Sequence, residues 1–510
     1  MDWTEGYVAE LGYTFGYYPE LNPLRAQLAL LASGYSAPEC STSCELGFGQ
    51  GMSINVHAAA SGTQWYGTDF NPAQAGFARE LASASGADAK LFDESFAEFC
   101  SRPDLPEFDS IGLHGIWSWI SDDNREVIVD FLRRKLKVGG LLYISYNTLP
   151  GWSSFAPLRH LMTEHAATFG SKGNGIVSRI NGSLEFADKL LASQPSYLKA
   201  NPQALERLKR VKDQNRSYLA HEYFNQDWHP MYFADMARWL SAAKLDFAGS
   251  AHYMDYLEAL NLLPDQQALL KTVPNALFRE STRDYMVNQQ FRRDYWVKGA
   301  RRLSGTDQLE ALRQQRVVLT SHRPDITNKV VGAQGEGTMS EALYQPILDL
   351  LSDHKVRSLA EIEQAMQSKN INFSQVVQAV LALGGSGHLA PAQTELQTEA
   401  ARSQTKKLNL ALLKRARGST ELGYLSSPVT GGALLVPRFQ QLFLHAIGQG
   451  KKTPAEWAAD AWQLISKQGQ KVMKDGKTLE TPEENLEELT SQANTFAQKQ
   501  LPILTALQMV

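Results

Sequence analysis

A glycine-rich turn close to the N-terminus has residue types suited to binding a nucleotide-like ligand. The turn, Glu45–Gly51 (ELGFGQG), lies between a short apolar segment and an alanine-rich stretch, as in a strand–turn–helix unit. Glycine is needed there because a Cβ would block positive φ angles and close approach of the backbone to a ligand. Asp69 ends a second apolar segment about 20 residues later, where a carboxylate can accept hydrogen bonds from both ribose hydroxyls.

Other side chains suited to catalysis or binding follow the next apolar segments. Asp93 follows segment 89–92, and His114 follows segment 108–113. His114 is a candidate cofactor contact or base, although an ordinary hydrogen-bonded histidine would fit the same position. Four aromatic residues either fill the core or line an acceptor pocket, where each face would attract a cationic amine or sulfonium by about 0.5 to 2 kcal/mol. They are Trp117, Trp119, Tyr146 and Trp152.

An alternation of strands and helices over roughly the first 150 residues must position these side chains. A helical pattern at 21–32 precedes the first strand, and two glycines at 139–140 separate a helix at 127–136 from a fifth strand at 141–146. Parallel strands joined by helices bring their carboxyl ends to one edge of the sheet, where ligands bind. The sequence therefore predicts an α/β, Rossmann-like fold with the candidate residues at that edge.

The turn and the strand ends resemble those of the class I methyltransferase family, which has an E/D-x-G-x-G-x-G turn, an acid after the second strand and a polar residue after the third. A nicotinamide dehydrogenase is the structural competitor, but its turn reads G-x-G-x-x-G. The resemblance implies S-adenosylmethionine (SAM) as cofactor, with the glycines beside its methionine part, Asp69 on its ribose and residues after the third strand at its adenine. The residues assigned to the cofactor are Glu45, Gly47, Gly49, Gly51, Asp69, Phe70, Asp93, Glu94, Ser95 and His114.

Short blocks farther along the chain narrow the class. Segments 145–152 (SYNTLPGW), 218–225 (YLAHEYFN), 228–230 (WHP) and 291–294 (FRRD) resemble bacterial methyltransferases that carry a methyltransferase regulatory domain. That family includes protein-lysine methyltransferases acting on outer-membrane proteins. The resemblance implies a protein substrate methylated on lysine. A sugar or other small acceptor, or a SAM-binding scaffold without turnover, are the alternatives.

The resemblance also suggests how an acceptor would be handled. A lysine amine must lose its proton and then attack the sulfonium methyl in line, without a metal. His114, Tyr146 and Asn147 are candidates for orienting or deprotonating it. His221 and Glu222 either reach the acceptor site or form an interdomain hydrogen-bonded pair, and an H-E-x-x-H zinc motif fails because position 225 is Asn. The tyrosine-rich segment 7–23 either closes over the cofactor or packs against helices.

The pattern predicts four domains. A SAM-binding domain at 1–165 precedes a mostly helical middle domain at 166–330, and the glycine-rich stretch 332–337 looks like a linker. Three helices and a glycine turn into a hairpin then predict a winged-helix-like domain at 338–400. The C-terminal region, 401–510, contains two helices whose starts, at 453–456 and 481–484, carry capping boxes with proline. Their apolar faces must pack on the body or on a second subunit, as in a homodimer.

Composition limits the partners and the compartment. A net charge of −4 and a pI near 6.3 predict no net electrostatic attraction to nucleic acid or to anionic membranes. No signal peptide or membrane span is recognisable. Three cysteines in 510 residues make no disulfide framework, which favours a reducing compartment and a cytoplasmic location.

Overall fold

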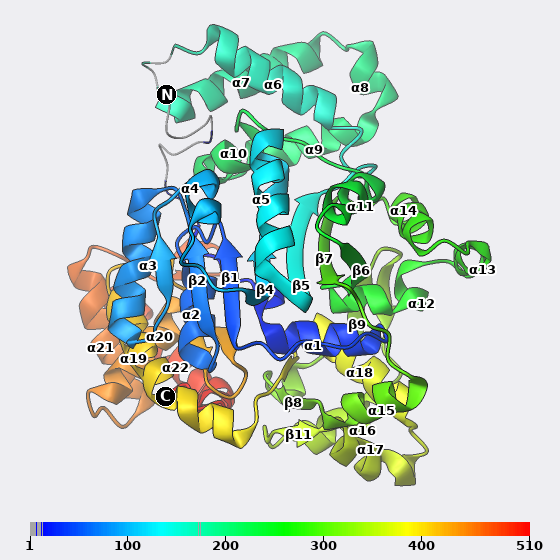
Figure 1. Cartoon of the computed structure of the whole chain (residues 1–510). Coiled ribbons are helices and arrows are strands. Elements are labelled where there is room, and N and C mark those ends of the chain that lie inside the picture. The colour runs from blue at the N-terminus through cyan, green and yellow to red at the C-terminus, as the bar shows by residue number, and fades with distance from the viewer. Residues whose placement is uncertain (1–6, 8–11, 13, 172, 174) are drawn as a thin grey trace.

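A seven-stranded sheet forms the centre of the molecule (Figure 1). The computed structural model describes residues 7, 12, 14–171, 173 and 175–510. The strand order is β3-β2-β1-β4-β5-β7-β6, with β7 antiparallel to both of its neighbours and the first five strands parallel. The strands are β1 (Thr42–Leu46), β2 (Gln64–Thr68), β3 (Lys90–Phe92), β4 (Phe108–Leu113), β5 (Leu136–Asn147), β6 (Leu245–Ser250) and β7 (Phe291–Lys298).

Helices between the parallel strands cover the sheet, which confirms the predicted Rossmann-like fold. They are α2 (Met52–Ala60), α3 (Pro72–Ser85), α4 (Phe96–Ser101) and α5 (Asp122–Lys135), and α1 (Pro23–Ala32) precedes β1. Local sequence explains where they start. Asn71 accepts hydrogen bonds from two amides of the first turn of α3, and Pro72 occupies the first helical position. Ser121 caps α5 in the same way.

The sheet extends beyond residue 165, because β6 and β7 lie in the segment predicted to be a separate middle domain. The domain boundaries themselves stay a prediction. Between β5 and β6 the chain forms a helical cap, which lies over the carboxyl edge of the parallel strands (Figure 1). Its helices are α6 (Ala156–Phe169), α7 (Gly175–Ala192), α8 (Ser196–Ala200), α9 (Pro202–Lys212) and α10 (Arg216–Tyr223), after which α11 (Phe233–Ser241) packs against β6 and α14.

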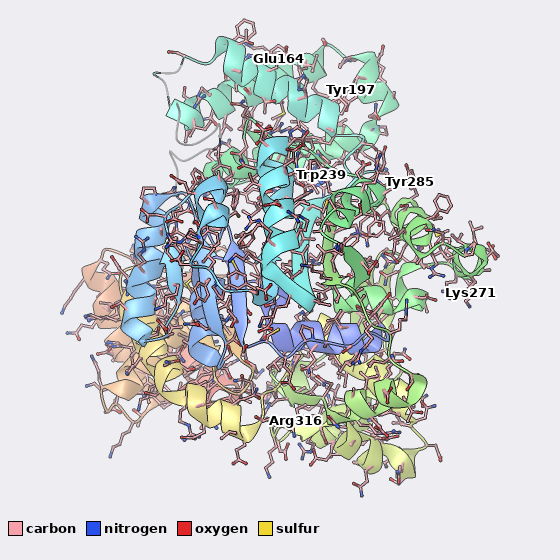
Figure 2. The ribbon with its side chains drawn as sticks, viewed as in Figure 1. Glu164, Tyr197, Trp239, Lys271, Tyr285 and Arg316 are labelled. Atoms are coloured by element: carbon pink, nitrogen blue, oxygen red, sulfur yellow. The ribbon has the colours of Figure 1, made fainter. Side chains whose placement is uncertain are left out.

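Three helices connect β6 to β7 on the outer side of the sheet. They are α12 (Glu258–Asn261), α13 (Pro264–Thr272) and α14 (Ala276–Met286). Lys271 and Tyr285 mark this side of the molecule in Figure 2. Short 3-10 helices lie in several connections: η1 (Pro19–Leu21), η2 (Trp117–Trp119), η4 (Tyr253–Tyr256), η5 (Arg323–Asp325) and η6 (Gln367–Lys369).

The glycine-rich stretch 332–337 is not a linker, and that prediction is wrong. It forms an antiparallel hairpin of β9 (Lys329–Gly332) and β10 (Gly335–Thr338). The hairpin packs on α12: a Cβ on Gly332 would lie 2.5 Å from Leu260 Cγ, so only glycine permits the contact. The glycines therefore serve close packing and a turn rather than flexibility.

The winged-helix prediction is not confirmed. The region contains three helices and two short strands: α16 (Glu341–Leu351), β11 (Arg357–Ser358), α17 (Leu359–Met366), α18 (Phe373–Gly385) and β12 (Leu389–Pro391). The centre of their small sheet is β8 (Arg316–Leu319), which follows α15 (Gly305–Gln314) and precedes the helices in the chain. After β12 the chain continues into a long helix instead of returning as a hairpin.

The C-terminal helices pack on the body of the protein. They are α19 (Glu395–Ala416), α20 (Arg438–Gly448), α21 (Pro454–Lys467) and α22 (Pro482–Ala506), with hairpins β13 (Tyr424–Ser427)–β14 (Gly432–Leu435) and β15 (Met473–Lys474)–β16 (Lys477–Thr478). Both predicted capping boxes are present, at Thr453 and Thr481. α19 lies against α2 and α3, where Thr405 Oγ1 donates to the Ala59 carbonyl at 3.0 Å.

The position of α19 explains the composition of α2. Every residue of α2 is buried, because the sheet covers one side and α19 another. One hydrophobic core thus runs from α2, α3 and the β2–β3 side of the sheet into the C-terminal helices. Among the residues that the structure describes, no helix is both long and apolar enough to cross a membrane.

Candidate active site

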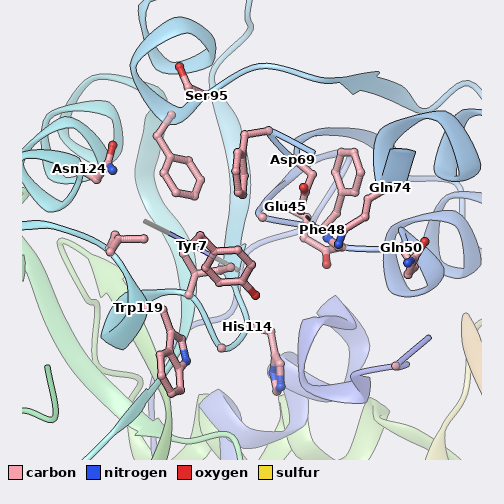
Figure 3. Close-up of a pocket in the computed structure, with 18 of the residues that line it drawn as sticks. Tyr7, Glu45, Phe48, Gln50, Asp69, Gln74, Ser95, His114, Trp119 and Asn124 are labelled. Atoms are coloured by element: carbon pink, nitrogen blue, oxygen red, sulfur yellow. Dashed lines mark hydrogen bonds between the residues drawn. The ribbon is translucent and has the colours of Figure 1, made fainter. Parts of the chain in front are cut away.

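A cavity opens at the carboxyl edge of the parallel strands, beneath the helical cap. It brings together the glycine turn, the ends of β2, β3 and β4, the start of α5 and a residue of the segment between α10 and α11. Figure 3 shows Glu45 and Asp69 on one side of it, Trp119 and Asn124 on the other, and Tyr7 between them. The lining residues are Tyr7, Thr14, Gly16, Tyr18, Glu45, Gly47, Phe48, Gly49, Gln50, Asp69, Phe70, Gln74, Glu94, Ser95, Phe96, His114, Gly115, Ile116, Trp119, Ile120, Ser121, Asn124 and Asp227.

The glycine turn adopts the left-handed backbone that its composition predicts. Gly47, Gly49 and Gly51 have φ angles of 72°, 57° and 71°. A Cβ on Gly47 would lie 2.4 Å from Cδ1 of Ile116, so a side chain there would push into the cavity wall. Gly51 does not line the cavity, and its missing Cβ instead lets α2 approach Ala78 of α3. Two glycines therefore shape the cavity and the third shapes the packing behind it.

Asp69 links the end of β2 to the glycine turn. Its carboxylate accepts hydrogen bonds from the Gly49 amide at 2.8 Å and from the Asn71 amide at 3.0 Å. Burial nevertheless raises the pKa of Asp69 to about 6, and the two hydrogen bonds oppose that rise. The side chain is only 6% exposed and lines the cavity beside Phe70, where donors from a ligand would stabilise its charged form.

Glu45 ends β1 as a buried acid that faces the cavity. It is 2% exposed, and its Oε2 has no hydrogen-bond partner among the residues that the structure describes. Burial first, and then the charge of Asp69, raises the pKa of Glu45 well above its usual range. A buried acceptor without a partner costs free energy unless a ligand satisfies it. The positively charged groups of SAM fit this position.

Of the three residues after β3 that were predicted to contact adenine, two face the cavity and one does not. Glu94 and Ser95 line the cavity, whereas Asp93 does not. The Asp93 carboxylate is 43% exposed and forms an ion pair with Arg79 on α3 at 2.5 Å. Glu94 Oε1 accepts from Arg102 at 2.6 Å, while its Oε2 is buried without a partner among the described residues. Glu94 therefore offers a second open acceptor to a ligand.

His114 follows β4 and lines the cavity. Its ring stacks on Tyr18 with the centroids 3.5 Å apart, and its Nδ1 lies 2.8 Å from the Tyr143 hydroxyl. Burial lowers the pKa of His114 to about 4, with Glu20 opposing the shift. The imidazole is therefore neutral near pH 7.

Of the four predicted aromatic pocket residues, only Trp119 lines the cavity. The others are buried behind its wall, where they are held by hydrogen bonds. Trp117 Nε1 donates to Met231 Sδ, Tyr146 donates to Asp294 at 2.8 Å, and Trp152 Nε1 donates to the Gln290 carbonyl at 2.9 Å. Asn147, predicted to orient the acceptor, is also buried, and its carbonyl accepts from the Met231 amide.

His221 and Glu222 lie on α10, one layer behind the cavity. The ring of Tyr7, which lines the cavity, lies 5.6 Å from His221 on one side and 5.8 Å from Phe70 on the other. Burial raises the pKa of Glu222 to about 7. Of the tyrosine-rich segment 7–23, residues 8–11 and 13 lie outside the described residues, and Tyr18 reaches the cavity wall.

Several lining residues were not predicted. Ile116, Ile120 and Ser121 flank the aromatic stretch that drew attention to Trp117 and Trp119, so their neighbourhood carried a signal. Asp227 directly precedes the Trp-His-Pro block, which is its only signal in the sequence. Others, such as Phe48 and Gln50 within the glycine turn, follow from the turn itself once its backbone is known.

The charges around the cavity are of one sign. Glu45, Asp69, Glu94 and Asp227 line it, and its described lining residues include neither lysine nor arginine. Arg102 pairs with Glu94 from outside the cavity, the one histidine in the wall is neutral, and the described lining supplies no cation to the four carboxyl groups. Such a cavity favours cations and disfavours anionic ligands.

The chain resembles known proteins over its whole length. The family described as "Predicted methyltransferase regulatory domain" matches residues 215–298, which contain α10, α11, β6 and β7. The Synechocystis protein sll1526 is 40% identical over 99% of both chains. A Rickettsia prowazekii protein, RP789, is 28% identical over 56% of this chain and 51% of its own.

A solved structure has the same fold. PKMT2 from Rickettsia typhi, in complex with AdoHcy, covers 97% of this chain and 100% of its own with a TM-score of 0.67 at 16% identity. The shared fold therefore includes the cap and the C-terminal helices as well as the sheet. The near-complete Synechocystis relative, together with the matched domain, shows that the chain belongs to the proteins that carry a methyltransferase regulatory domain, and its fold is that of PKMT2.

Proposed function

We propose that the protein transfers methyl groups from SAM to lysine side chains of a protein substrate. The observation that carries the proposal is the charge of the cavity: four carboxyl groups line it, and lysine and arginine are missing from its described lining. SAM brings a sulfonium and an ammonium group, and a lysine brings a second ammonium. An acidic cavity with an aromatic wall suits this pair better than a neutral sugar or an anionic metabolite.

The cofactor would occupy the side of the cavity built by the glycine turn. Asp69 would accept hydrogen bonds from the ribose, the open oxygen of Glu45 would meet the ammonium, and Glu94 and Ser95 would meet the adenine. SAM supplies an activated methyl group when bound. The protein contributes orientation, since holding reactants in line is worth effective molarities of about 10^5 M or more.

The transfer itself needs few groups from the protein. The lysine amine releases its proton to solvent, its lone pair forms the new N–C bond, and the C–S electron pair stays on sulfur as S-adenosylhomocysteine leaves. His114 is neutral near pH 7 and lies in the wall, where its imidazole can hydrogen-bond the incoming amine without repelling it.

Two measurements test the proposal. Calorimetry should detect SAM binding to the wild type that is weakened in Asp69→Ala. Isotope-labelled SAM should then transfer its methyl group to proteins of a bacterial membrane fraction, with the label recovered as methyl-lysine after hydrolysis. Label found only in small molecules would select a small-molecule acceptor, and binding without transfer would select a scaffold. Absence of SAM binding would refute the methyltransferase function.

A further inference from the structure

Asp227 is the one acid of the cavity that comes from the matched regulatory domain. It lies between α10 and α11, about 130 to 180 residues beyond the three acids at the strand ends. Its side chain is 28% exposed, and its Oδ1 lies 3.2 Å from Nε2 of His229. The other acids follow β1, β2 and β3, beside the glycine turn. Asp227 therefore needs a separate explanation.

The segment that carries Asp227 is anchored at both ends. Before it, Arg159 on α6 donates to the Asn225 carbonyl at 2.6 Å. After it, the Met231 amide donates to the Asn147 carbonyl at the end of β5, at 3.0 Å. Arg159 and Asn147 are both buried. These contacts fix the backbone on either side of Asp227, so its carboxylate is held at the cavity by the fold.

The neighbours of Asp227 attach it to the aromatic side of the cavity. The His229 amide donates to the Ser118 carbonyl at 2.8 Å, and the ring of Trp228 lies 6.3 Å from that of Trp119. In Figure 3, Trp119 lies across the cavity from Glu45 and Asp69. A carboxylate and an indole therefore occupy the wall that the glycine turn and its acids leave free.

This pairing has a defined ligand chemistry. A carboxylate forms charge-assisted hydrogen bonds with a primary ammonium, and an indole face attracts the same cation. The opposite wall already holds the open oxygen of Glu45, a side chain 2% exposed, so the cavity presents carboxyl groups at two separate places. The ammonium group of SAM and the ammonium group of a lysine acceptor match these two places.

We infer that Asp227 is a specificity-determining residue that binds the ammonium group of the acceptor beside Trp119, which makes the regulatory domain part of the acceptor site. The inference rests on the proposed function and adds to it the residue that selects an amine over a hydroxyl acceptor. Asp227 acts in binding, and the amine still loses its proton to solvent before transfer.

Two matched ligands test the inference without an identified protein substrate. Both are S-adenosylhomocysteine analogues whose sulfur is replaced by nitrogen. One carries an aminoethyl chain whose amine stands in for the acceptor nitrogen, and the other carries a hydroxyethyl chain of the same length. Calorimetry on the full-length wild type should show the amine binding at least about ten-fold more tightly than the alcohol, as expected for a charge-assisted hydrogen bond.

Three variants separate the role of Asp227 from general electrostatics. Asp227→Asn should reduce the preference for the amine to less than about two-fold while S-adenosylhomocysteine binds as in the wild type. Asp227→Glu, which keeps the charge, should retain most of the preference. Asp123→Asn removes a charge from an exposed position on α5 outside the cavity and should keep the full preference. Thermal unfolding establishes that each variant is folded.

The outcomes are distinguishable. A wild type that binds both analogues equally, or an Asp227→Asn variant that keeps the preference, overturns the inference and leaves SAM-dependent methyl transfer intact. If Asp227→Asn unfolds, the inference is judged from the ratio of amine to alcohol affinity in the wild type and in Asp227→Glu. A wild type that binds none of the adenosine ligands overturns the proposed function and the inference with it.

Discussion

Cofactor affinity should fall as the pH falls through about 6, because Asp69 must be ionised to accept hydrogen bonds from the ribose. Burial raises the pKa of Asp69 to about 6, so the carboxylate is almost fully charged at pH 8 and about nine-tenths protonated at pH 5. Protonation of a single required group then weakens binding about ten-fold over this range, which corresponds to about 1.4 kcal/mol. His114, with a pKa of about 4, stays largely neutral throughout.

The same titration has the opposite sign for the stability of the unliganded protein. The pKa of Asp69 is raised above its value of 3.8 in an unfolded chain, so between pH 4 and 6 the folded state binds more protons. Its charge therefore costs stability above pH 6, and lowering the pH from 8 to 5 recovers about 1.4 kcal/mol. A ligand-binding carboxylate that is buried before the ligand arrives should behave in this way.

The assay compares the wild type with Asp69→Asn, which keeps the size and one acceptor oxygen but has no charge to lose. Calorimetric titrations with S-adenosylhomocysteine at pH 5, 6, 7 and 8 give the ratio of the two dissociation constants at each pH. The dissociation constant of Asp69→Asn divided by that of the wild type should fall about ten-fold from pH 8 to pH 5, because only the wild type loses affinity. Glu45 remains in both proteins, so its own titration largely cancels. A ratio that stays constant across the range would refute the role given to Asp69.

Three further predictions concern the turn, the buried charges and the C-terminal helices. Gly47→Ala should weaken SAM binding at least about ten-fold, since the Cβ meets the cavity wall at positive φ, whereas Gly62→Ala, with open space around it, should bind normally in the same calorimetric assay. Arg292→Met leaves Asp284 and its neighbours as buried acids without their cation. Urea denaturation should show that the free energy of unfolding falls by about 3 to 5 kcal/mol, and a loss below about 1 kcal/mol would contradict that account. Deletion of residues 395–510 should yield aggregates on size-exclusion chromatography, because α2 and α3 lose their cover, and a folded monomer that binds SAM would show the helices to be dispensable.

Local sequence predicted the side of the cavity that the glycine turn builds. The glycine turn and Asp69 belong to one strand–turn–helix–strand unit, whose geometry is set by residues close together in the chain. Within that unit, Gly51 and Asp93 are the predicted residues that do not line the cavity. Asp93 and Glu94 are adjacent, but successive side chains at the end of a strand point to opposite sides, so one meets Arg79 on the surface and the other lines the cavity.

The acceptor side could not be predicted in the same way. Trp117 and Trp119 are two residues apart in a short 3-10 helix, and contacts of Trp117 with distant residues such as Met231 and Trp239 hold it behind the cavity wall. The linker and the hairpin of a winged helix were also expected from glycine alone. Glycine permits turns and close packing as readily as flexibility. Which of these roles a glycine has depends on the residue that packs against it, and that residue, such as Leu260 against Gly332, is distant in sequence.

The sequence by itself determined the fold class, the glycine turn and the acid that follows it, because periodicity and turn chemistry act over a few residues. The tertiary structure decided that β6 and β7 complete the sheet, that α19 covers α2, and that Asp227 joins the cavity. Each of these depends on contacts between segments tens to hundreds of residues apart. Burial of complementary surfaces selects such contacts from many that the same local patterns would allow.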